Sequence, residues 1–530
     1  MKELIVERNR YFDSVFLMRI SSELEKLSGV TQAVVAMATP INVENLMKSG
    51  FELRIQDEAI RPADLIIAID AESSEAAACV HDQLAKLLAG GTGDEASPSA
   101  GASPTSLDAA LAADPDINLA LISVPGIHAT REARKALHRG LHVMLFSDNV
   151  TVKDEIALKD DAINRGLLMM GPDCGTAILN GAALGFANAC RSGSIGIVGA
   201  SGTGIQEISS LVHQLGGGIS QAIGTGGRDL SADVDGRMTR FGIEALGCNP
   251  DTNVIVVVSK TPSPTVADKV LASLAATGKP GVVHFIGGQA AQLSDKLETT
   301  GTLADAALAA VVKSGNGVPE VSHPAGHPSP IPTPTATSST GVSADSETPK
   351  QLATITGRVA GFYCGGTLCQ EAWNILTQAG IDVSSNVAGD KRKKIHPETE
   401  VAGHVVWDLG DDAFTVGKPH PMIEPSLRDS RVAQAGADPT VGVILADCVI
   451  GYGAHENPAA SLAEAALRAI DAARKDGRRL IVVASVTGTD QDPQNLHHQR
   501  KILEVAGITV APSNAAAARW VVHGMKGGIS

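Results

Sequence analysis

Aromatic residues are scarce in this sequence, and long apolar runs are missing. Phe, Trp and Tyr make up 3% of the 530 residues, whereas glycine occurs 55 times and 44% of the residues are hydrophobic. This small-residue composition is typical of proteins built from βαβ units, in which helices approach sheets closely. Because single cores stop growing at about 250–300 residues, we expect three or four domains.

The cysteines offer no disulfide framework or zinc site. There are seven of them, without any CxxC pair, and such an odd, irregular set favours reduced thiols and therefore a cytoplasmic protein. No stretch approaches about 18 uninterrupted apolar residues, and the N-terminus lacks the apolar core of a signal peptide. We therefore expect neither a membrane-spanning segment nor export.

Positive charge is also in deficit. The chain has 43 Lys and Arg against 58 Asp and Glu, a formal net charge of −15. Nucleic-acid binding needs a basic face that displaces counterions, so we expect no nucleic-acid partner. The one basic run, Lys391–Lys394, is followed by Glu398 and Glu400, which favours a solvated loop.

Two segments rich in Pro, Ser, Thr, Gly and Ala interrupt the chain. Residues 90–107 and 316–350 have too little apolar content to fold, so we interpret them as linkers. Around them we predict an α/β fold with four units: a small α/β sandwich over 1–89, a parallel doubly wound sheet over 108–190, and two related domains over 192–315 and 352–528. Ligands of such sheets bind beyond the carboxyl ends of the strands.

The two related domains share a motif. Gly-Thr-Gly-Ile-Gln-Glu at 202–207 returns as Gly-Thr-Leu-Cys-Gln-Glu at 366–371, each time between a strand-like run and a helical pattern. Backbone N–H groups at such a helix start attract anions. The predicted phosphate-binding residues are Gly199, Ser201, Gly202, Thr203 and Gly204 in the first copy and Gly366 and Thr367 in the second. The first copy has the serine and is the better candidate, while the alternative of a capped turn without a ligand stays open for both.

Other polar residues also follow predicted strands. Arg228 either clamps a carboxylate or phosphate or forms a surface salt bridge, and His420, between two prolines, could orient or protonate a substrate. The acidic group Asp408–Asp412 suits Mg²⁺ or serves solubility, so no metal ligand is assigned. Further predicted ligand-binding residues are Asp173, Cys174, Gly226, Gly227, Asp447 and Thr487. No base lies near Cys174 in the sequence, which disfavours a nucleophile there.

Nearly the whole chain resembles the FdrA proteins, described as acyl-CoA-synthetase-like and related to the α-subunit of succinyl-CoA synthetase. The stretches that carry the resemblance are 12–15, 145–150, 170–176, 199–207, 226–230, 416–423 and 486–489. The resemblance implies a Rossmann-like domain of CoA-binding type over 108–190 and flavodoxin-like domains of ligase type over 192–315 and 352–528. Succinyl-CoA synthetase carries a phosphorylated histidine in a Gly-His-Ala-Gly loop. Here the loop reads Gly287-Gly288-Gln289-Ala290-Ala291, and His284 lies inside the preceding strand.

The resemblance also implies an activity. Members of the family look like subunits of oxamate carbamoyltransferase in allantoin breakdown, which converts oxalurate and phosphate into oxamate and carbamoyl phosphate. We predict catalytic roles for Ser201, Thr203, Arg228 and His420, phosphate as a substrate, a small carboxylate or carbamoyl substrate, and partner subunits. CoA, Mg²⁺ and a homo-oligomer stay open. The alternatives are an acyl-CoA ligase that works with a separate nucleotide-binding subunit, since the chain shows no ATP-grasp domain, and a non-catalytic scaffold.

Overall fold

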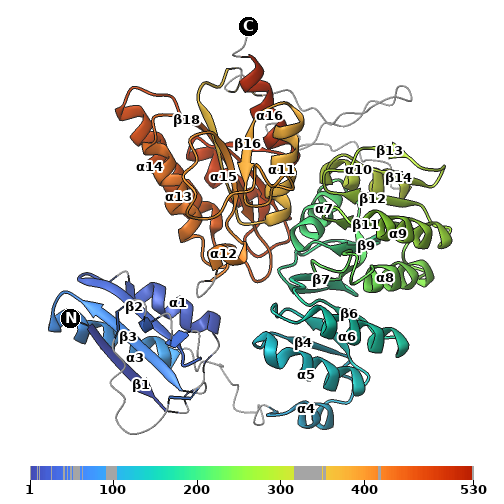
Figure 1. Ribbon diagram of the computed structural model, residues 1–530, viewed down its shortest axis with the longest axis horizontal. Coiled ribbons are helices and arrows are strands. Elements are labelled where there is room, and N and C mark those ends of the chain that lie inside the picture. The colour runs from blue at the N-terminus through green and yellow to red at the C-terminus, as the bar shows by residue number, and fades with distance from the viewer. Residues whose placement is uncertain are drawn as a thin grey trace. The chain divides into compact units, whose positions relative to one another are not determined.

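The computed structural model describes residues 2–90 with gaps, 104–315, 349, 352, 354–415 and 419–527. The gaps in the first range are 9, 11, 13, 26, 40–41, 44–45, 48–49, 52–59 and 62–63. Most of both predicted linkers lies outside the described residues. The chain divides into two units, which are Met1–Ala113 with Asp412–His420, and Asp114–Asp411 with Pro421–Ser530 (Figure 1). Each unit is described by itself.

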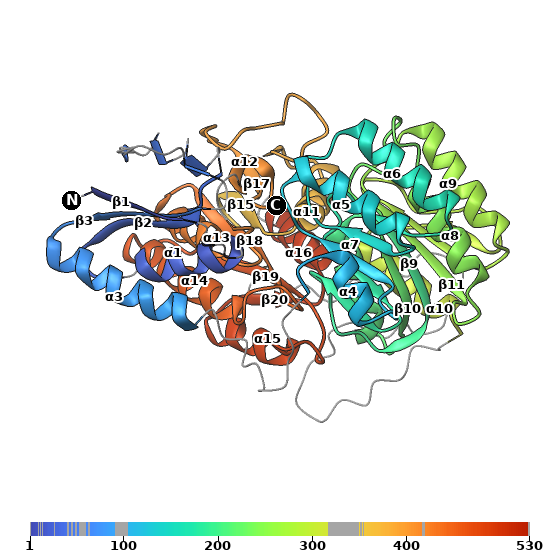
Figure 2. The ribbon, with the colours of Figure 1, turned by 90° about the horizontal axis from the view of Figure 1, so that it is seen from below.

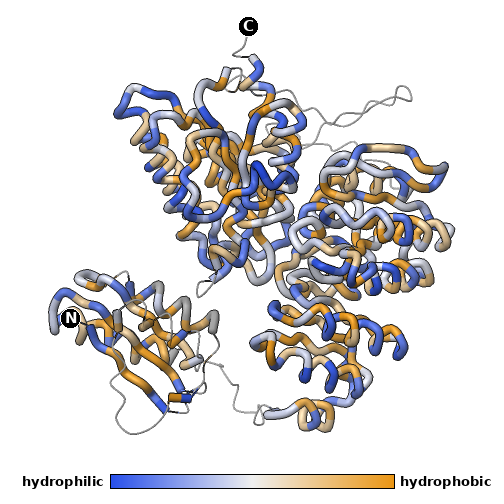
Figure 3. Tube along the Cα trace, in the orientation of Figure 1, coloured by the Kyte–Doolittle hydropathy of each residue, from blue (hydrophilic) through white to orange (hydrophobic). Residues whose placement is uncertain are grey.

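The N-terminal unit is an α/β sandwich. Its sheet has the order β1-β3-β2 and is antiparallel. In β2, alternate residues such as Val35 and Met37 are buried, because their face of the sheet packs against helices. Figure 3 shows hydrophobic residues along these strands. The elements are β1 (Lys2–Glu7), α1 (Ser14–Glu25), β2 (Val30–Met37), β3 (Leu65–Ala71), α3 (Ser74–Gly90), α4 (Leu107–Ala113) and the short α12 (Asp412–Thr415).

The C-terminal unit begins with a parallel three-stranded sheet in the order β4-β5-β6. Helices follow the first two strands, as expected where each crossover returns the chain to a parallel neighbour. The N-cap Thr151 accepts a hydrogen bond from the backbone N–H of Asp154 and fixes the start of α6. The elements are β4 (Leu119–Ile122), α5 (Gly126–His138), β5 (His142–Leu145), α6 (Val152–Asn164) and β6 (Met169–Met170).

An eight-stranded sheet follows, with the order β13-β14-β12-β11-β9-β10-β7-β8. Its central strands are parallel and have the flavodoxin-like order β10-β9-β11-β12-β14, while β7 and β8 form an antiparallel hairpin at one edge. Helices α8 and α9 lie together on one face (Figure 2), and α7 packs with α10. The strands are β7 (Thr176–Leu179), β8 (Ala182–Gly185), β9 (Ser192–Ala200), β10 (Ile219–Gly224), β11 (Val254–Ser259), β12 (Gly281–Phe285), β13 (Ala291–Gln292) and β14 (Leu297–Thr299). The helices are α7 (Gly202–Gln214), α8 (Arg237–Cys248), α9 (Pro264–Ala276) and α10 (Leu303–Lys313).

The last sheet has six strands, all parallel, in the order β16-β17-β15-β18-β19-β20. Every residue of β18 is buried, as expected for a central strand covered on both faces. Helices α13 and α14 lie on one side of β18, and α11 and α16 on the other (Figure 1). The strands are β15 (Arg358–Tyr363), β16 (Val383–Ser385), β17 (His404–Asp408), β18 (Val441–Val449), β19 (Ile481–Thr487) and β20 (Thr509–Ala511). The helices are α11 (Gly366–Gln378), α13 (Ser426–Ala437), α14 (Pro458–Lys475), α15 (Leu496–Val505) and α16 (Asn514–Gly527).

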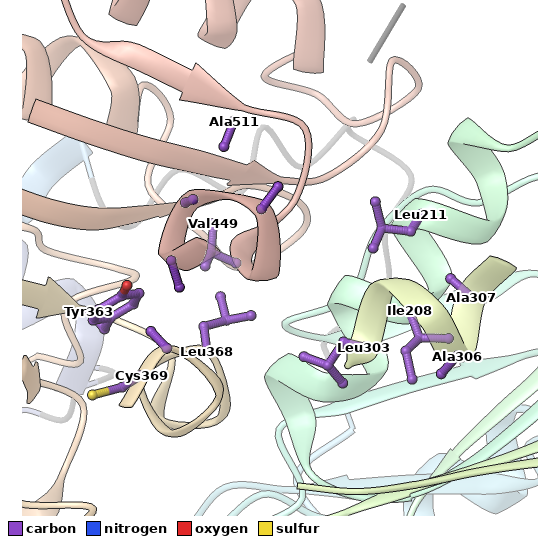
Figure 4. Close-up of a cluster of buried hydrophobic side chains, with 14 of the residues drawn as sticks. Ile208, Leu211, Leu303, Ala306, Ala307, Tyr363, Leu368, Cys369, Val449 and Ala511 are labelled. Atoms are coloured by element: carbon purple, nitrogen blue, oxygen red, sulfur yellow. The ribbon is translucent and has the colours of Figure 1, made fainter. Parts of the chain in front are cut away.

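One hydrophobic cluster joins the eight-stranded and six-stranded sheets. Ile208 and Leu211 of α7 belong to it together with Leu368 of α11, and Figure 4 shows side chains from both sides of the contact. Helices α7 and α11 contact each other, as do α10 and α16. The two duplicated domains therefore share a core, and the relative position of α7 and α11 is fixed by burial of apolar surface.

The prediction of a multidomain α/β fold with parallel sheets is confirmed. Among the described residues, none of the helices combines the length and the apolar character needed to cross a bilayer.

Candidate functional site

The topology of each large sheet defines a crevice at the carboxyl ends of its strands. In the eight-stranded sheet the chain leaves β9 toward β10 on one side and later reaches β11 on the other. In the six-stranded sheet β15 lies between β17 and β18 in the same way. Ligands of open α/β sheets bind at such switch points. The residues that follow β9 and β15 are the two Gly-Thr turns.

The first turn is capped by a serine. Ser201 is the N-cap of α7, and its Oγ accepts a hydrogen bond of 3.2 Å from the N–H of Gly204. Gly199 allows the helix to approach the sheet, because a Cβ there would lie 2.7 Å from Cγ1 of Ile205. Ser201 and Thr203 are almost completely buried, and Gly202 is half-buried.

The second turn is stabilised by a carboxylate of its own domain. Asp447 in β18 accepts hydrogen bonds from the N–H groups of Cys364 (2.7 Å) and Gly365 (2.8 Å). Asp447 is fully buried, and burial raises its pKa. A carboxyl group of the protein thus already accepts N–H groups at the start of α11, which makes the second copy different from the first.

The two turns face each other. Ser201 Oγ and Thr367 Oγ1 are 2.5 Å apart and share a hydrogen bond. A Cβ at Gly365 would lie 2.9 Å from Cγ2 of Thr203, so the turns are in van der Waals contact. The positive ends of α7 and α11 therefore meet at one place, a combination that favours a negatively charged ligand.

Two charged residues from the neighbouring strand ends act on each other at this junction. Lys260 follows β11 and is exposed, and Asp408 ends β17 and is 7% exposed. Burial raises the pKa of Asp408 to about 7, and the positive charge of Lys260 acts against this rise. Neither was among the predicted site residues as an acid or base. Both are nevertheless the first charged residues at the carboxyl ends of strands beside β9 and β15, which is a signal that the sequence carries.

The glutamates of the duplicated motif cap helices of the opposite domain. Glu207 of α7 accepts hydrogen bonds from Thr487 Oγ1 and from the N–H of Asn514, the first residue of α16. Glu371 of α11 accepts hydrogen bonds from the N–H of Leu303, the first residue of α10, and from Asn514 Nδ2. Burial raises the pKa of both carboxyl groups, that of Glu371 to about 7. Thr487, predicted to bind ligand, is therefore engaged with Glu207.

Two further loops lie beside the first turn. A Cβ at Gly226 would lie 2.2 Å from the carbonyl oxygen of Pro172, and one at Gly227 would lie 3.2 Å from Asp173 Oδ2. Cys174 is buried, its Sγ donates to the carbonyl of Thr176, and burial raises its pKa to about 12. A thiol in this state is a poor nucleophile at neutral pH. The structure thus brings Asp173, Gly226 and Gly227 together but leaves Cys174 a packing role.

Arg228 is committed to an internal contact. Its Nη2 lies 2.9 Å from Glu155 Oε2 and donates to the carbonyl of Val150. Glu155 also accepts a hydrogen bond from Lys159, which in turn binds Asp229, and these last three side chains are fully buried. Two cations and two carboxylates are balanced here, so this network joins α6 to the glycine-rich loop. Of the two roles predicted for Arg228, the structure places it in the salt bridge.

His420 belongs to the other unit of the chain. The segment Asp412–His420 groups with the N-terminal unit, whereas Ser201 and Thr203 belong to the C-terminal unit. Burial lowers the pKa of His420 to about 4, which keeps the imidazole neutral at physiological pH. The role predicted for His420 stays a prediction.

The loop that corresponds to the phosphohistidine loop follows β12. His284 is inside that strand, 1% exposed, with Nδ1 3.0 Å from the carbonyl oxygen of Thr300, and burial lowers its pKa. This confirms the prediction that His284 is not presented at the loop.

One cavity of about 440 Å³ lies elsewhere in the six-stranded domain. It is formed between the loop 397–401 and α13, over one face of β15 and β17. Arg358 at the start of β15 and Asp438 before β18 line it, so it reaches the amino ends of the strands. None of the predicted site residues lines this cavity.

Family models match three parts of the chain. Residues 1–104 match "AllF, heavy metal-associated domain", 191–287 match "CoA binding domain", and 362–523 match "CoA-ligase". The protein YahF of Escherichia coli K12, described as uncharacterized, is 42% identical over 514 residues, which cover 97% of this chain and 96% of YahF. The chain belongs to the FdrA-like family. The predicted family resemblance is thereby confirmed.

Other members of this wider group are more distant. The mitochondrial succinate–CoA ligase [ADP-forming] subunit alpha-2 of Trichomonas vaginalis is 28% identical over 212 residues, 39% of this chain and 65% of that protein. A solved acetyl-coenzyme A synthetase 1 of Ca. Korarchaeum cryptofilum is 14% identical, covers 78% of this chain and 83% of its own, and has a TM-score of 0.30, too low to carry any argument. Members of the FdrA-like family are related to CoA ligases and succinyl-CoA synthetases within the acyl-CoA synthetase group. The CoA-binding match at 191–287 lies on the segment 192–315, for which we predicted a ligase-type domain. The predicted domain boundaries stay predictions.

The heavy-metal description does not fit the residues of the N-terminal unit. Soft heavy metals favour thiolate ligands, and residues 1–104 contain one cysteine, Cys79, which is exposed on α3. The part of the chain that the structure describes contains no cluster of three or more His, Cys, Asp or Glu residues suited to a metal. No metal-dependent step is derived from this domain.

Proposed function

We propose that this FdrA-like protein is a subunit of a carbamoyl- or acyl-phosphate transferase, with oxamate carbamoyltransferase as the specific activity. In that reaction oxalurate and phosphate give oxamate and carbamoyl phosphate. The observation that carries the proposal is the meeting of α7 and α11 through Ser201 and Thr367. Two positive helix ends at adjoining switch points suit a reaction in which phosphate and a carboxylate substrate are bound together.

The first turn supplies the phosphate site in this proposal. The N–H groups of a helix's first turn have no intrahelical partners, and Ser201 occupies that of Gly204. The N–H groups of Gly202 and Thr203 are then left to bind phosphate oxygens. At the second turn Asp447 occupies the N–H groups of Cys364 and Gly365, which favours a single phosphate site in the first copy.

The chemistry is a displacement at the carbamoyl carbon. Phosphate held at α7 attacks that carbon, and N–H groups at the helix starts stabilise the oxyanion that develops on its oxygen. A loop histidine is not needed, because phosphate itself is the nucleophile. The sequence Gly287–Ala291 without histidine agrees with such a route.

A second candidate is an acid–CoA ligase that works with a separate nucleotide-binding subunit. It is favoured by the CoA-binding and CoA-ligase family matches and by the similarity to a protein named as a succinate–CoA ligase subunit. This candidate requires consumption of ATP and CoA and a phosphorylated protein intermediate. The buried His284 disfavours it.

The test is a comparison of substrate mixtures. The chain is purified alone and together with the proteins encoded beside it, then given carbamoyl phosphate plus oxamate, with phosphate release and oxalurate followed. A parallel mixture holds ATP, CoA and a small acid. We expect phosphate and oxalurate only in the first mixture; turnover only with CoA would reject the proposal in favour of the ligase. A stable complex without turnover in either mixture would instead make the chain a scaffold.

A further inference from the structure

Asp408 lies where the last residue of β17 meets the start of α11. It is 7% exposed, and its Oδ1 accepts a hydrogen bond of 3.0 Å from the N–H of Gly410. A Cβ at Gly366 would lie 2.4 Å from Oδ2, so Oδ2 faces the half-buried first residue of α11. Within the described part of the chain, Oδ2 accepts no hydrogen bond, which leaves one oxygen of a buried carboxyl group directed at the helix junction.

The charged surroundings of Asp408 come from both duplicated domains. Lys260, from the eight-stranded domain, favours the carboxylate, while Asp411 and the buried Asp447 disfavour it. The Cys369 thiol of α11 also lies within electrostatic range and is itself kept protonated by burial. Burial is the largest influence and brings the pKa of Asp408 to about 7, a value at which both protonation states are populated at neutral pH.

We infer that Asp408 is the proton donor and acceptor of the carbamoyl-transfer reaction, and that Lys260 favours its ionised form. The inference rests on the proposed function. Asp408 approaches the junction at Gly366, beside the hydroxyl pair of Ser201 and Thr367. A ligand bound there by the N–H groups of α7 lies within the same small region.

The reaction needs such a group because its leaving group is a nitrogen. As phosphate oxygen bonds to the carbamoyl carbon, the bond from that carbon to the oxamate nitrogen breaks. An amide anion is too basic to leave without a proton, so Asp408 gives its proton to the nitrogen and takes the proton from the phosphate hydroxyl. Hydrogen phosphate and oxalurate thus become carbamoyl phosphate and oxamate, and Asp408 returns to its initial state.

The test uses two variants in the complex with its partner proteins. Asp408→Asn cannot transfer a proton, so we expect kcat to fall by about 10²–10⁴-fold with the KM for phosphate unchanged. In the direction that forms oxamate, wild-type activity should fall as pH rises above about 7. This falling limb of the pH–activity profile should be absent in Asp408→Asn. Glu464→Gln, which removes an exposed carboxylate of α14, is the matched control and should keep the wild-type profile.

Lys260→Gln gives a measurement that does not depend on the stability of Asp408→Asn. Lys260 is exposed, and its ammonium lowers the pKa of Asp408, so its removal should move the falling limb to higher pH. A limb that stays in place in Lys260→Gln, or full activity in a folded Asp408→Asn, would overturn the role of Asp408 while leaving carbamoyl transfer intact. An inactive wild-type complex would instead reject the proposed function, and the role of Asp408 with it.

Discussion

Ser201 and Thr367 hold the two halves of an internal duplication together at their equivalent helix starts. Their hydroxyl oxygens are 2.5 Å apart, although the two residues are distant in the chain and follow strands of different sheets. Each is followed within two helical turns by a glutamate that caps a helix of the opposite domain. The duplicated motif thus has two structural roles. Its first residues form the junction of the two helix starts, and its glutamates bind helices of the opposite domain.

Replacing Ser201 and Thr203 together by alanine should impair phosphate binding. The variant loses the hydroxyl groups of the first turn, so we expect the KM for phosphate to rise by about tenfold or more, at a cost of about 1 kcal/mol in helix capping. Steady-state kinetics at varied phosphate, with circular dichroism for folding, measures this. Thr299→Ala, at the end of strand β14, serves as the control. Unchanged kinetics would mean that the turn is only a cap.

Lys159→Met should destabilise the C-terminal unit. The ammonium binds Glu155 and Asp229 at 2.7 and 2.8 Å, and all three side chains are fully buried. Loss of one member of a buried ion pair typically costs about 3–5 kcal/mol, because a buried charge loses its partner. Here that charge is Asp229, since Glu155 keeps its contact with Arg228. Lys269→Met, which breaks an exposed pair with Asp235, should cost less than about 1 kcal/mol. Urea unfolding of both variants decides whether the network stabilises the fold.

The stability of the contact between the duplicated domains should fall as pH rises from about 5 to about 7. Burial raises the pKa of Glu371 from its ordinary value of 4.5 to about 7, so in this window the folded protein holds a proton that the unfolded chain has lost. The stabilisation is complete below the unfolded pKa and is lost as pH rises through the folded one, on the order of 3 kcal/mol in total.

Hydrogen exchange at the start of α10 measures this effect locally, since Glu371 accepts the N–H of Leu303. After correction for the intrinsic exchange rate, the protection of the Leu303 N–H in the wild-type protein should decrease as pH rises. In Glu371→Gln this protection should depend less on pH. The exposed Glu464→Gln is again the reference. An identical pH dependence in all three proteins would contradict the raised pKa.

Alkylation at neutral pH should separate the cysteines by burial. Cys79 and Cys248 are exposed, whereas Cys174, Cys364, Cys369 and Cys448 are buried, and burial raises the pKa of each of these four thiols. We expect iodoacetamide to modify the first two in the native protein and all seven after unfolding. Mass spectrometry of the peptides reads this out. Rapid labelling of Cys174 in the native protein would contradict its packing role and favour a nucleophilic one.

Local patterns were sufficient to predict the helix starts of the site. A buried strand followed by glycine and threonine specifies a tight strand–helix turn, so α7 at Gly202 and α11 at Gly366 follow from the sequence. The inequality of the two turns was also visible, since Ser201 has no counterpart in the second copy. Contacts between residues distant in the chain could not be predicted. Asp447 at the second turn and Glu155 beside Arg228 come from other elements.

The sequence by itself determined the α/β class, the duplication, the family and the absence of a presented histidine, because these depend on local pattern and composition. Tertiary structure decided which polar groups meet. Packing of α7 and α11 in one shared core brought Ser201 to Thr367 and placed Lys260 within range of Asp408. The raised pKa of Asp408 arises mainly from burial, and Lys260 of the other domain opposes it. Neither the burial nor the position of Lys260 can be read from the residues that adjoin Asp408 in sequence.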